Sequence, residues 1–292
     1  MRRAQKENLI RGFFCLFALL SIFFLSGIVI VLFKEGLPIF KDTSLGEFLF
    51  GKFWYPTYEP PDFGILPLLL GSLWVTLGAL IIAVPLGVAG ALYISEAASP
   101  KIKEFIKPVI ELLAGIPSVV YGFFGMVVVA PLVAKIFNLP VGLNAFTASM
   151  LLGIMAIPTI TSISEDAISA VPESFKEASY ALGANKWETT AKVTLPAAVG
   201  GISTAIILGM ARVIGETMTV LMVAGGAVVI PHSFFEPVRT MTATIAAEMG
   251  ETVAGSAHFH ALFAIAIVLF VITLSFNIIA DLLAQRFRRR LG

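Results

Sequence analysis

Residues 177–196 read EASYALGANKWETTAKVTLP, a polar segment between two strongly apolar ones. Good helix formers run from Glu173 to Leu182, and Pro172 before them suits a helix start, where no amide donor is required. Gly183 tolerates the backbone angles that end one helix and begin another. The stretch therefore predicts a short amphipathic hairpin of two helices, of a kind that docks into a partner's groove. On composition alone, an ordinary solvated connecting loop is the alternative.

The rest of the chain has the composition of a membrane protein. Of its 292 residues 58% are hydrophobic and 13% charged, and the mean hydropathy is +0.93. A helix needs about 20 apolar residues to cross a hydrocarbon core of roughly 30 Å. Six segments meet this length, and we expect an all-α protein with transmembrane helices at 10–33, 66–95, 109–136, 145–164, 197–228 and 258–283. Pro85, Pro117 and Pro158 fall inside these segments, where helix packing tolerates a bend.

The distribution of Lys and Arg predicts that both termini are cytoplasmic. The cytoplasmic side then holds Arg2, Arg3, Lys6, Arg11, Lys101, Lys103, Lys107, Lys176, Lys186, Lys192, Arg286, Arg288, Arg289 and Arg290. The outer side holds only Lys34, Lys41, Lys52, Lys135 and Arg239. This orientation places the hairpin in the cytoplasm, where ATP is available.

Several functional classes find no support in the sequence. There is no glycine-rich loop ending in Gly-Lys-Ser or Gly-Lys-Thr, so we expect ATP and Mg²⁺ to bind only in a separate subunit and no cofactor in this chain. No nucleophile and base are arranged for catalysis, and no basic domain is present for nucleic acid. Cys15 is the single cysteine, and His258 and His260 point in different directions on a helix, so no metal site is expected.

The spacing within the hairpin resembles the EAA loop of ABC-importer permeases, the loop that grips the ATPase. The matching residues are Glu177, Ala178, Ser179, Gly183, Leu195 and Pro196. Ser179 and Val193 are conservative departures from the family pattern.

Further segments are similar to the permease subunits of the phosphate ABC importer. They include LAGIPSVVYGFFG (113–125), AVPLGVAGALYISEAAS (83–99), IMAIPTITSISEDAISAVPESFKEAS (154–179) and ARVIGETMTV (211–220). GETM (215–218) and TMTATIAAEMG (240–250) resemble the C-type rather than the A-type subunit. The first span and the loop after it add little to the match.

The resemblance implies a type I importer permease fold in the inner membrane of a bacterium or archaeon. Residues 1–65 would form an N-terminal transmembrane helix and external loop, and residues 66–292 the permease core with the coupling hairpin at 172–196. The implied partners are a paralogous permease, a cytoplasmic ATPase dimer and an external phosphate-binding protein. The chain itself would be a transport subunit and not an enzyme.

Arg212 and Glu216 are the candidate residues of the phosphate path. Arg212 lies roughly 24 Å along a helix from Pro196, and a charge at such depth costs about 2.5 to 3.5 kcal/mol, so it normally faces the bundle interior and marks a pathway. Its guanidinium can give two parallel hydrogen bonds to an oxyanion. Glu216, four residues on, is expected on the same helix face as a partner. The alternative is a static ion pair that only fixes helix packing.

Two external segments carry further predictions. Residues 34–65, with several aromatic residues and prolines, are either a cap or docking surface or a solvated connector. Residues 241–251, MTATIAAEMGE, have helix-like content and are expected to fold against the outer mouth through Thr242, Thr244 and Glu248.

Two other functions stay open at this point. One is an ABC permease for a different oxyanion, such as sulfate or molybdate. The other is an ion-coupled secondary transporter or channel, in which the pair formed by Arg212 and Glu216 would be the gate.

Overall fold

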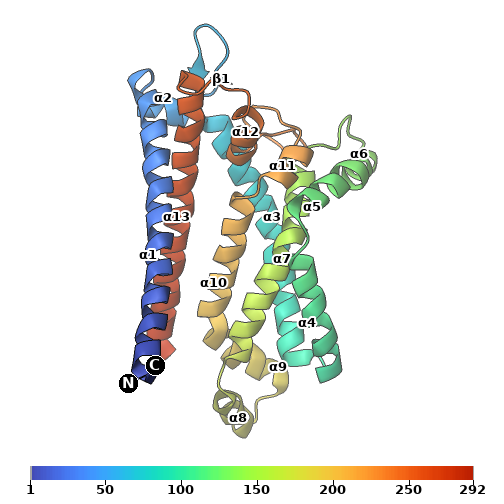
Figure 1. Ribbon diagram of the computed structural model, residues 1–292. Coiled ribbons are helices and arrows are strands. Elements are labelled where there is room, and N and C mark those ends of the chain that lie inside the picture. Colours follow the sequence, from blue (N-terminus) through green and yellow to red (C-terminus); the bar gives the residue numbers. More distant parts are fainter. Residues whose placement is uncertain (1, 292) are drawn as a thin grey trace.

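The long helices run between two opposite ends of the molecule, and both chain ends lie beside the helical hairpin at one of them (Figure 1). The computed structural model describes residues 2–291, with side chains for residues 10–279, 281, 282 and 285. Within these residues, six helical segments are long and apolar enough to cross a membrane: Ile10–Lys41, Leu66–Ala97, Ser118–Ile136, Ala145–Ser169, Lys186–Ile214 and Ala257–Ile279. The predicted number of spans is confirmed. The basic side chains predicted inside at 2, 3, 6 and 286–290 lie outside the described side chains.

Three helices form the centre of the bundle. They are α3 (Leu66–Leu92), α7 (Ala145–Ser169) and α10 (Leu195–Ile214). Small residues such as Ala79, Ala83 and Ala156 are fully buried between them together with Leu151 and Ile160. Because lipid is as apolar as leucine, close packing of small residues is what holds transmembrane helices together. Pro85 and Pro158 lie inside α3 and α7, as predicted.

The first and last helices form a pair at the side of the bundle (Figure 1). They are α1 (Arg2–Gly36) and α13 (Ala257–Leu291). Apolar side chains of α1 are widely exposed, for example Phe14 at 67% and Phe23 at 71%. Such a surface is stable only against lipid or another membrane protein.

The segment after α1 is a folded cap and not a solvated connector. It consists of η1 (Leu37–Lys41), α2 (Leu45–Phe50) and the antiparallel strands β1 (Trp54–Tyr55) and β2 (Asp62–Phe63). Ile39, Phe48 and Trp54 are buried in one core with Leu262 and Ile265 of α13. These helices and strands are short, in agreement with the number of prolines in the segment. The domain boundary at residue 65 stays a prediction.

Two predicted spans are interrupted, and the other four differ from the prediction only at their ends. In place of one helix at 109–136 there are α4 (Pro100–Ala114), α5 (Ser118–Phe124), the π-turn η3 (Gly125–Val129) and α6 (Ala130–Ile136). Pro117 is not inside a helix: it precedes α5 as its N-cap, since proline cannot donate and disfavours helical geometry in the residue before it. In place of a helix at 197–228, α10 ends at Ile214 and α11 (Met218–Val223) follows.

The remaining elements belong to the two ends of the bundle. At the end of α3 is the π-turn η2 (Tyr93–Ala97), and the hairpin contains α8 (Glu173–Ala181), α9 (Lys186–Thr189) and the π-turn η4 (Thr190–Thr194). At the opposite end lies α12 (Met241–Glu248), as the sequence predicted for this segment.

Candidate functional site

The hairpin between α7 and α10 has the predicted form of helix, turn and helix. Gly183 adopts φ +86°, a left-handed conformation that favours glycine, and its amide donates to the carbonyl of Tyr180 at 2.9 Å. Asn185 and Glu188 then form a reciprocal capping box that starts α9. These local bonds fix the turn without help from the transmembrane core.

A buried hydrogen bond joins the two arms of the hairpin. The hydroxyl oxygens of Ser179 and Thr189 lie 2.9 Å apart, and both residues are buried in the described structure. Ser179 is one of the two departures from the EAA pattern. The structure therefore gives this serine a role, since an alanine could not form the bond.

The outer face of the hairpin is open. Leu182 is 90% and Trp187 76% exposed, and Glu177 and Ala178 beside them are exposed as well. Among the described residues, Glu177 has no hydrogen-bond or ion-pair partner. Large apolar side chains presented to water on a well-fixed turn are typical of a surface that another protein covers.

Leu195 and Pro196 begin the transmembrane arm of the hairpin. Leu195 is half-buried and Pro196, in the first turn of α10, is exposed. α9, η4 and α10 follow one another without interruption from Lys186 to Ile214. The second arm of the hairpin is therefore a continuation of the fifth transmembrane helix.

An ion pair ties the first arm of the hairpin to the end of α3. Lys176 Nζ lies 2.8 Å from Glu96 Oε1 of η2, and their side chains are only 14% and 10% exposed. Burial lowers the pKa of Lys176, but the hydrogen bond and the charge of Glu96 raise it by more, so this pKa stands above its ordinary value. The lysine is therefore charged at neutral pH. The sequence analysis missed this pair, although an acid at the inner end of a span opposite a hairpin lysine was the available signal.

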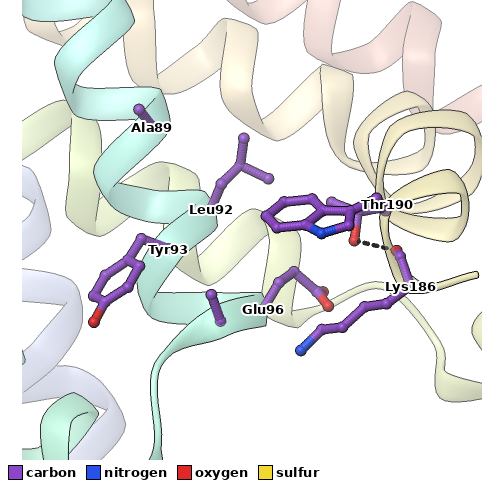
Figure 2. Close-up of a pocket in the computed structure, with 8 residues that line it drawn as sticks. Ala89, Leu92, Tyr93, Glu96, Lys186 and Thr190 are labelled. Carbon is purple, nitrogen blue, oxygen red and sulfur yellow. Dashed lines mark hydrogen bonds between the residues drawn. The ribbon is translucent and has the colours of Figure 1, made fainter.

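A cavity of about 370 Å³ lies beside this ion pair. Its lining comes from the end of α3, from η2 and from the hairpin: Ala89, Leu92, Tyr93, Glu96, Ala97, Lys186, Trp187 and Thr190. In Figure 2, Lys186 extends from α9 toward Glu96, and the hydroxyl of Thr190 donates to the carbonyl of Lys186 at 2.9 Å. The hairpin thus touches η2 through α8 and stands apart from it along α9.

A second group of charges ties α4 to α7. Lys103 and Lys107 place Nζ atoms 2.6 and 2.8 Å from the carboxylate of Glu165, whose side chain is 3% exposed. Ser169 also donates to Glu165, at 3.0 Å. A buried carboxylate needs such partners, because an unpaired charge in a low-dielectric interior is strongly unfavourable.

Arg212 lies in the last turn of α10, and its side chain reaches the end of α4. Its Nη2 donates to the carbonyl of Ala114 at 3.4 Å, and the hydroxyl of Tyr121 donates to the neighbouring carbonyl of Leu113 at 3.1 Å. These are the last two residues of α4; the carbonyl of Leu113 also accepts the amide of Ile116 at 3.4 Å. A cation near a helix C-terminus also complements the helix dipole.

The predicted ion pair between Arg212 and Glu216 is not formed. Because α10 ends at Ile214, the four-residue spacing does not place the two side chains on one helix face. Glu216 Oε1 instead accepts hydrogen bonds from the amides of Met218 at 3.1 Å and Thr219 at 3.2 Å. The carboxylate thereby satisfies amides that begin α11 and have no helical acceptor.

The two helix interruptions lie against each other. Thr219 Oγ1 donates to the carbonyl of Ser118 at 3.0 Å, which joins the start of α11 to the start of α5. Thr242 Oγ1 of α12 donates to the carbonyl of Glu216 at 2.8 Å. Irregular backbone at membrane depth is tolerated where protein groups bond it or where it lines a cavity, and transporters bind their substrates at such sites. Glu216 and Thr242 are therefore bonded at the second interruption, whereas Arg212 bonds the end of α4 at the first one.

The other two outer-mouth candidates have separate positions. Thr244 is fully buried and donates to the carbonyl of Thr240 within its own helix, at 2.9 Å. Glu248 is surrounded by three side chains that the sequence analysis did not connect with it. Its carboxylate lies 3.0 Å from Nε1 of Trp54, 2.7 Å from Nη1 of Arg239 and 2.9 Å from Nε2 of His258.

Comparison with protein families identifies the chain. Residues 83–289 match the family described as binding-protein-dependent transport system inner membrane component. The chain belongs to this family. Its multi-pass helices accordingly lie in the inner membrane. The cytoplasmic position of the hairpin stays a prediction from the distribution of Lys and Arg.

Individual relatives match nearly the whole chain. The probable ABC transporter permease protein YqgH of Bacillus subtilis is 39% identical over 98% of this chain and 94% of its own length. The phosphate transport system permease protein PstC of Mesorhizobium japonicum is 35% identical over 94% of this chain and 89% of its own.

Solved structures confirm the type I importer permease fold. A chain of the bacterial alginate ABC transporter in complex with its periplasmic protein has a TM-score of 0.60 at 16% identity, covering 92% of this chain and 94% of that one. A chain of the MetNI methionine ABC transporter, in an inward-facing conformation, has a TM-score of 0.56 at 20% identity, covering 77% and 94%.

Proposed function

We propose that the chain is the C-type permease subunit of an ATP-driven phosphate importer. Relatives named phosphate transport system permease protein PstC support the anion, among them the Haemophilus influenzae protein, 34% identical over 98% of this chain. The observation that carries the proposal is the position of Arg212. This exposed guanidinium lies where two interrupted helices meet, and Nη2 is its one bonded nitrogen among the described residues.

The chemistry of Arg212 suits a tetrahedral oxyanion. A guanidinium offers five N–H donors in a planar fork, and two of them can bond two phosphate oxygens at once. The hydrogen bond from Arg212 to the carbonyl of Ala114 is long, at 3.4 Å, and its acceptor is uncharged. A charged phosphate oxygen is a stronger acceptor and can therefore displace this carbonyl. Phosphate would thus take the place of the α4 carbonyl as the anion passes.

The proposed function requires three partners. An ATPase dimer, which binds ATP and Mg²⁺, docks on the hairpin, where Glu177 and Leu182 are exposed. A paralogous permease covers the other side of the path, and an external phosphate-binding protein delivers the anion. The chain contributes transport and no catalysis.

Uptake by the purified complex in lipid vesicles tests the function. The complex co-purified with this chain is reconstituted with ATP inside and the binding protein outside, and radiolabelled phosphate is measured in the vesicles. We expect ATP-dependent uptake of phosphate, competition by arsenate and little effect of sulfate or molybdate. Uptake of sulfate or molybdate in place of phosphate would show that the chain transports a different oxyanion. Phosphate uptake without ATP would show that the chain belongs to a secondary transporter or channel.

Substitutions in the hairpin test the ATPase surface. Gly183→Pro removes the amide that bonds Tyr180 and imposes a negative φ, and Glu177→Lys reverses an exposed charge. We expect both to abolish uptake and weaken ATPase co-purification while the chain still inserts in the membrane. Glu104→Lys is the matched control for the charge reversal, because Glu104 is exposed on α4 and has no ion-pair partner among the described residues. Normal uptake with full ATPase yield in both variants would exclude the docking role.

A further inference from the structure

We infer that α4 is the connection between the ATPase-docking hairpin and Arg212. At its cytoplasmic end, Lys103 of α4 bonds Glu165 of α7, the helix that leads into the hairpin. Lys176 of the hairpin bonds Glu96, just before α4, and the other end of α4 carries the carbonyl that bonds Arg212. This assignment rests on the proposed function in two respects: an ATPase docks on the hairpin, and Arg212 meets the transported anion. It makes Lys176 and Glu96 positioning residues for transport.

The first contact acts at the start of α4. Lys176 of α8 bonds Glu96, which is only four residues before Pro100, the first residue of α4. The short link between them is constrained, because the amide of Ala98 donates to the carbonyl of Tyr93 at 2.8 Å. A displacement of α8 therefore moves the base of α4 through a charge-assisted bond that is largely shielded from water.

The second contact acts one turn further along α4. Lys103 and Lys107 both bond Glu165, near the end of α7. Only residues 170–172 separate α7 from α8, so Glu165 is fixed to the entry of the hairpin. The base of α4 is thus bonded to α7, which enters the hairpin, and the hairpin itself bonds Glu96, four residues before α4.

Because α4 is packed loosely, the ion pairs at its base determine its position. No residue of α4 is buried, and Phe105 and Leu112 are each 73% exposed. The helix is about 22 Å long at 1.5 Å per residue. At its far end the carbonyls of Leu113 and Ala114 receive Tyr121 and Arg212. A helix held mainly by polar contacts at both ends moves as a unit when one end is displaced.

Charge reversal of the pair and a swap of its two charges provide the test. The variants are Lys176→Glu, Glu96→Lys and the double swap, each purified as the full complex. Two quantities are measured per assembled complex: phosphate uptake, and the ATP hydrolysis that the loaded binding protein stimulates. We expect each single reversal to lower both by about tenfold, within the range of coupling energies known for linked sites, and the swap to restore most of both.

A matched control comes from α4 itself. Lys101 and Glu104 are both exposed, and among the described residues neither has an ion-pair partner. The swap Lys101→Glu with Glu104→Lys repeats the change of charge without touching the connection, and we expect uptake and stimulated hydrolysis within about twofold of the unmodified complex. If a reversal variant does not assemble, Lys176→Met with Glu96→Gln removes the charges with less repulsion, and the same tenfold losses are expected of it.

Two results would overturn the inference. In the first, the variants yield less complex, but phosphate uptake and stimulated ATP hydrolysis per complex are unchanged. The pair would then contribute only to assembly. The other is a double swap that assembles fully and stays as inactive as the single reversals. A wrong assignment of the anion gives a different result, because the unmodified complex would then take up no phosphate. The effect of the Lys176 and Glu96 variants on stimulated ATP hydrolysis could still be measured.

Discussion

Arg212 and Glu248 are both charged side chains of the permease core, yet the chain holds them in opposite ways. Glu248 has three partners at 2.7 to 3.0 Å and is 17% exposed. Arg212 is exposed and has one bond, at 3.4 Å, to a backbone carbonyl. A charge whose partners all come from its own chain stabilises structure, whereas a charge with spare donors is available to a ligand. The sequence analysis had placed both among functional candidates.

Arg212→Met should have the largest effect on transport. With the guanidinium gone, we expect phosphate uptake to fall by about a hundredfold or more, as when a charged group that meets the substrate is removed. The complex should still assemble with its ATPase, because Arg212 makes only one weak bond within the chain. Uptake per complex and the yield of ATPase subunits are the measurements. Arg212→Lys should also transport poorly, because lysine lacks the planar fork.

The double variant Arg212→Met with Glu216→Met sharpens this test. If Arg212 served only to neutralise Glu216, removing both charges would restore transport. The structure has no such pair, so we expect the double variant to assemble and stay inactive. Near-normal uptake would refute the anion-path role of Arg212.

Glu248→Ala should give the opposite result, a loss of stability with little loss of transport per complex. Trp54, Arg239 and His258 would each lose a partner, and we expect about 3 kcal/mol of destabilisation, as for a hydrogen bond to a charged group whose loss leaves buried donors. Thermal unfolding of the purified complex measures this. Uptake per complex reduced as strongly as in Arg212→Met would remove the contrast between the two charges.

Replacements of Glu216 separate its capping from its charge. Glu216→Gln keeps an oxygen that can accept from Met218 and Thr219, so stability should change little. Glu216→Ala removes the acceptor and should cost about 1 kcal/mol, as for other lost helix caps. The midpoint of thermal unfolding distinguishes them. Equal destabilisation by both variants would show that the negative charge, and not the hydrogen bonds, is what matters.

Trp54→Phe should have a small effect on the thermal stability of the complex. The ring that fills the core of the cap is largely kept, and one hydrogen bond to Glu248 is lost. We expect about 1 kcal/mol or less, the net contribution of a typical hydrogen bond. A loss as large as that of Glu248→Ala would mean that the indole alone holds the carboxylate.

The hairpin was predictable because its signals are local. Pro172 before a run of helix formers, and Gly183 at a point that needs positive φ, specify two short helices wherever the segment lies. The six spans were predictable for the same reason, since a run of about 20 apolar residues suffices.

The helix interruptions were not predictable from hydropathy. Residues 115–117 and 215–217 lie inside apolar runs, and the average over a run conceals a break of three residues. Glu216 was misplaced in consequence, because its predicted pairing assumed a continuous helix. The partners of Glu248 were hidden for another reason: Trp54 is 194 residues away in the sequence, and only the folded cap brings it there.

The helix from Lys186 to Ile214 is continuous, so a small rotation at its cytoplasmic end produces a larger displacement at its other end. Twenty-six residues separate Lys186, in the hairpin, from Arg212, which corresponds to a length of about 39 Å at 1.5 Å per residue. Pivoted at its cytoplasmic end by about 5°, a helix of this length carries the arginine by about 3 Å. That travel equals a whole hydrogen-bond length, so a small tilt of this helix is enough to exchange one partner of the guanidinium for another.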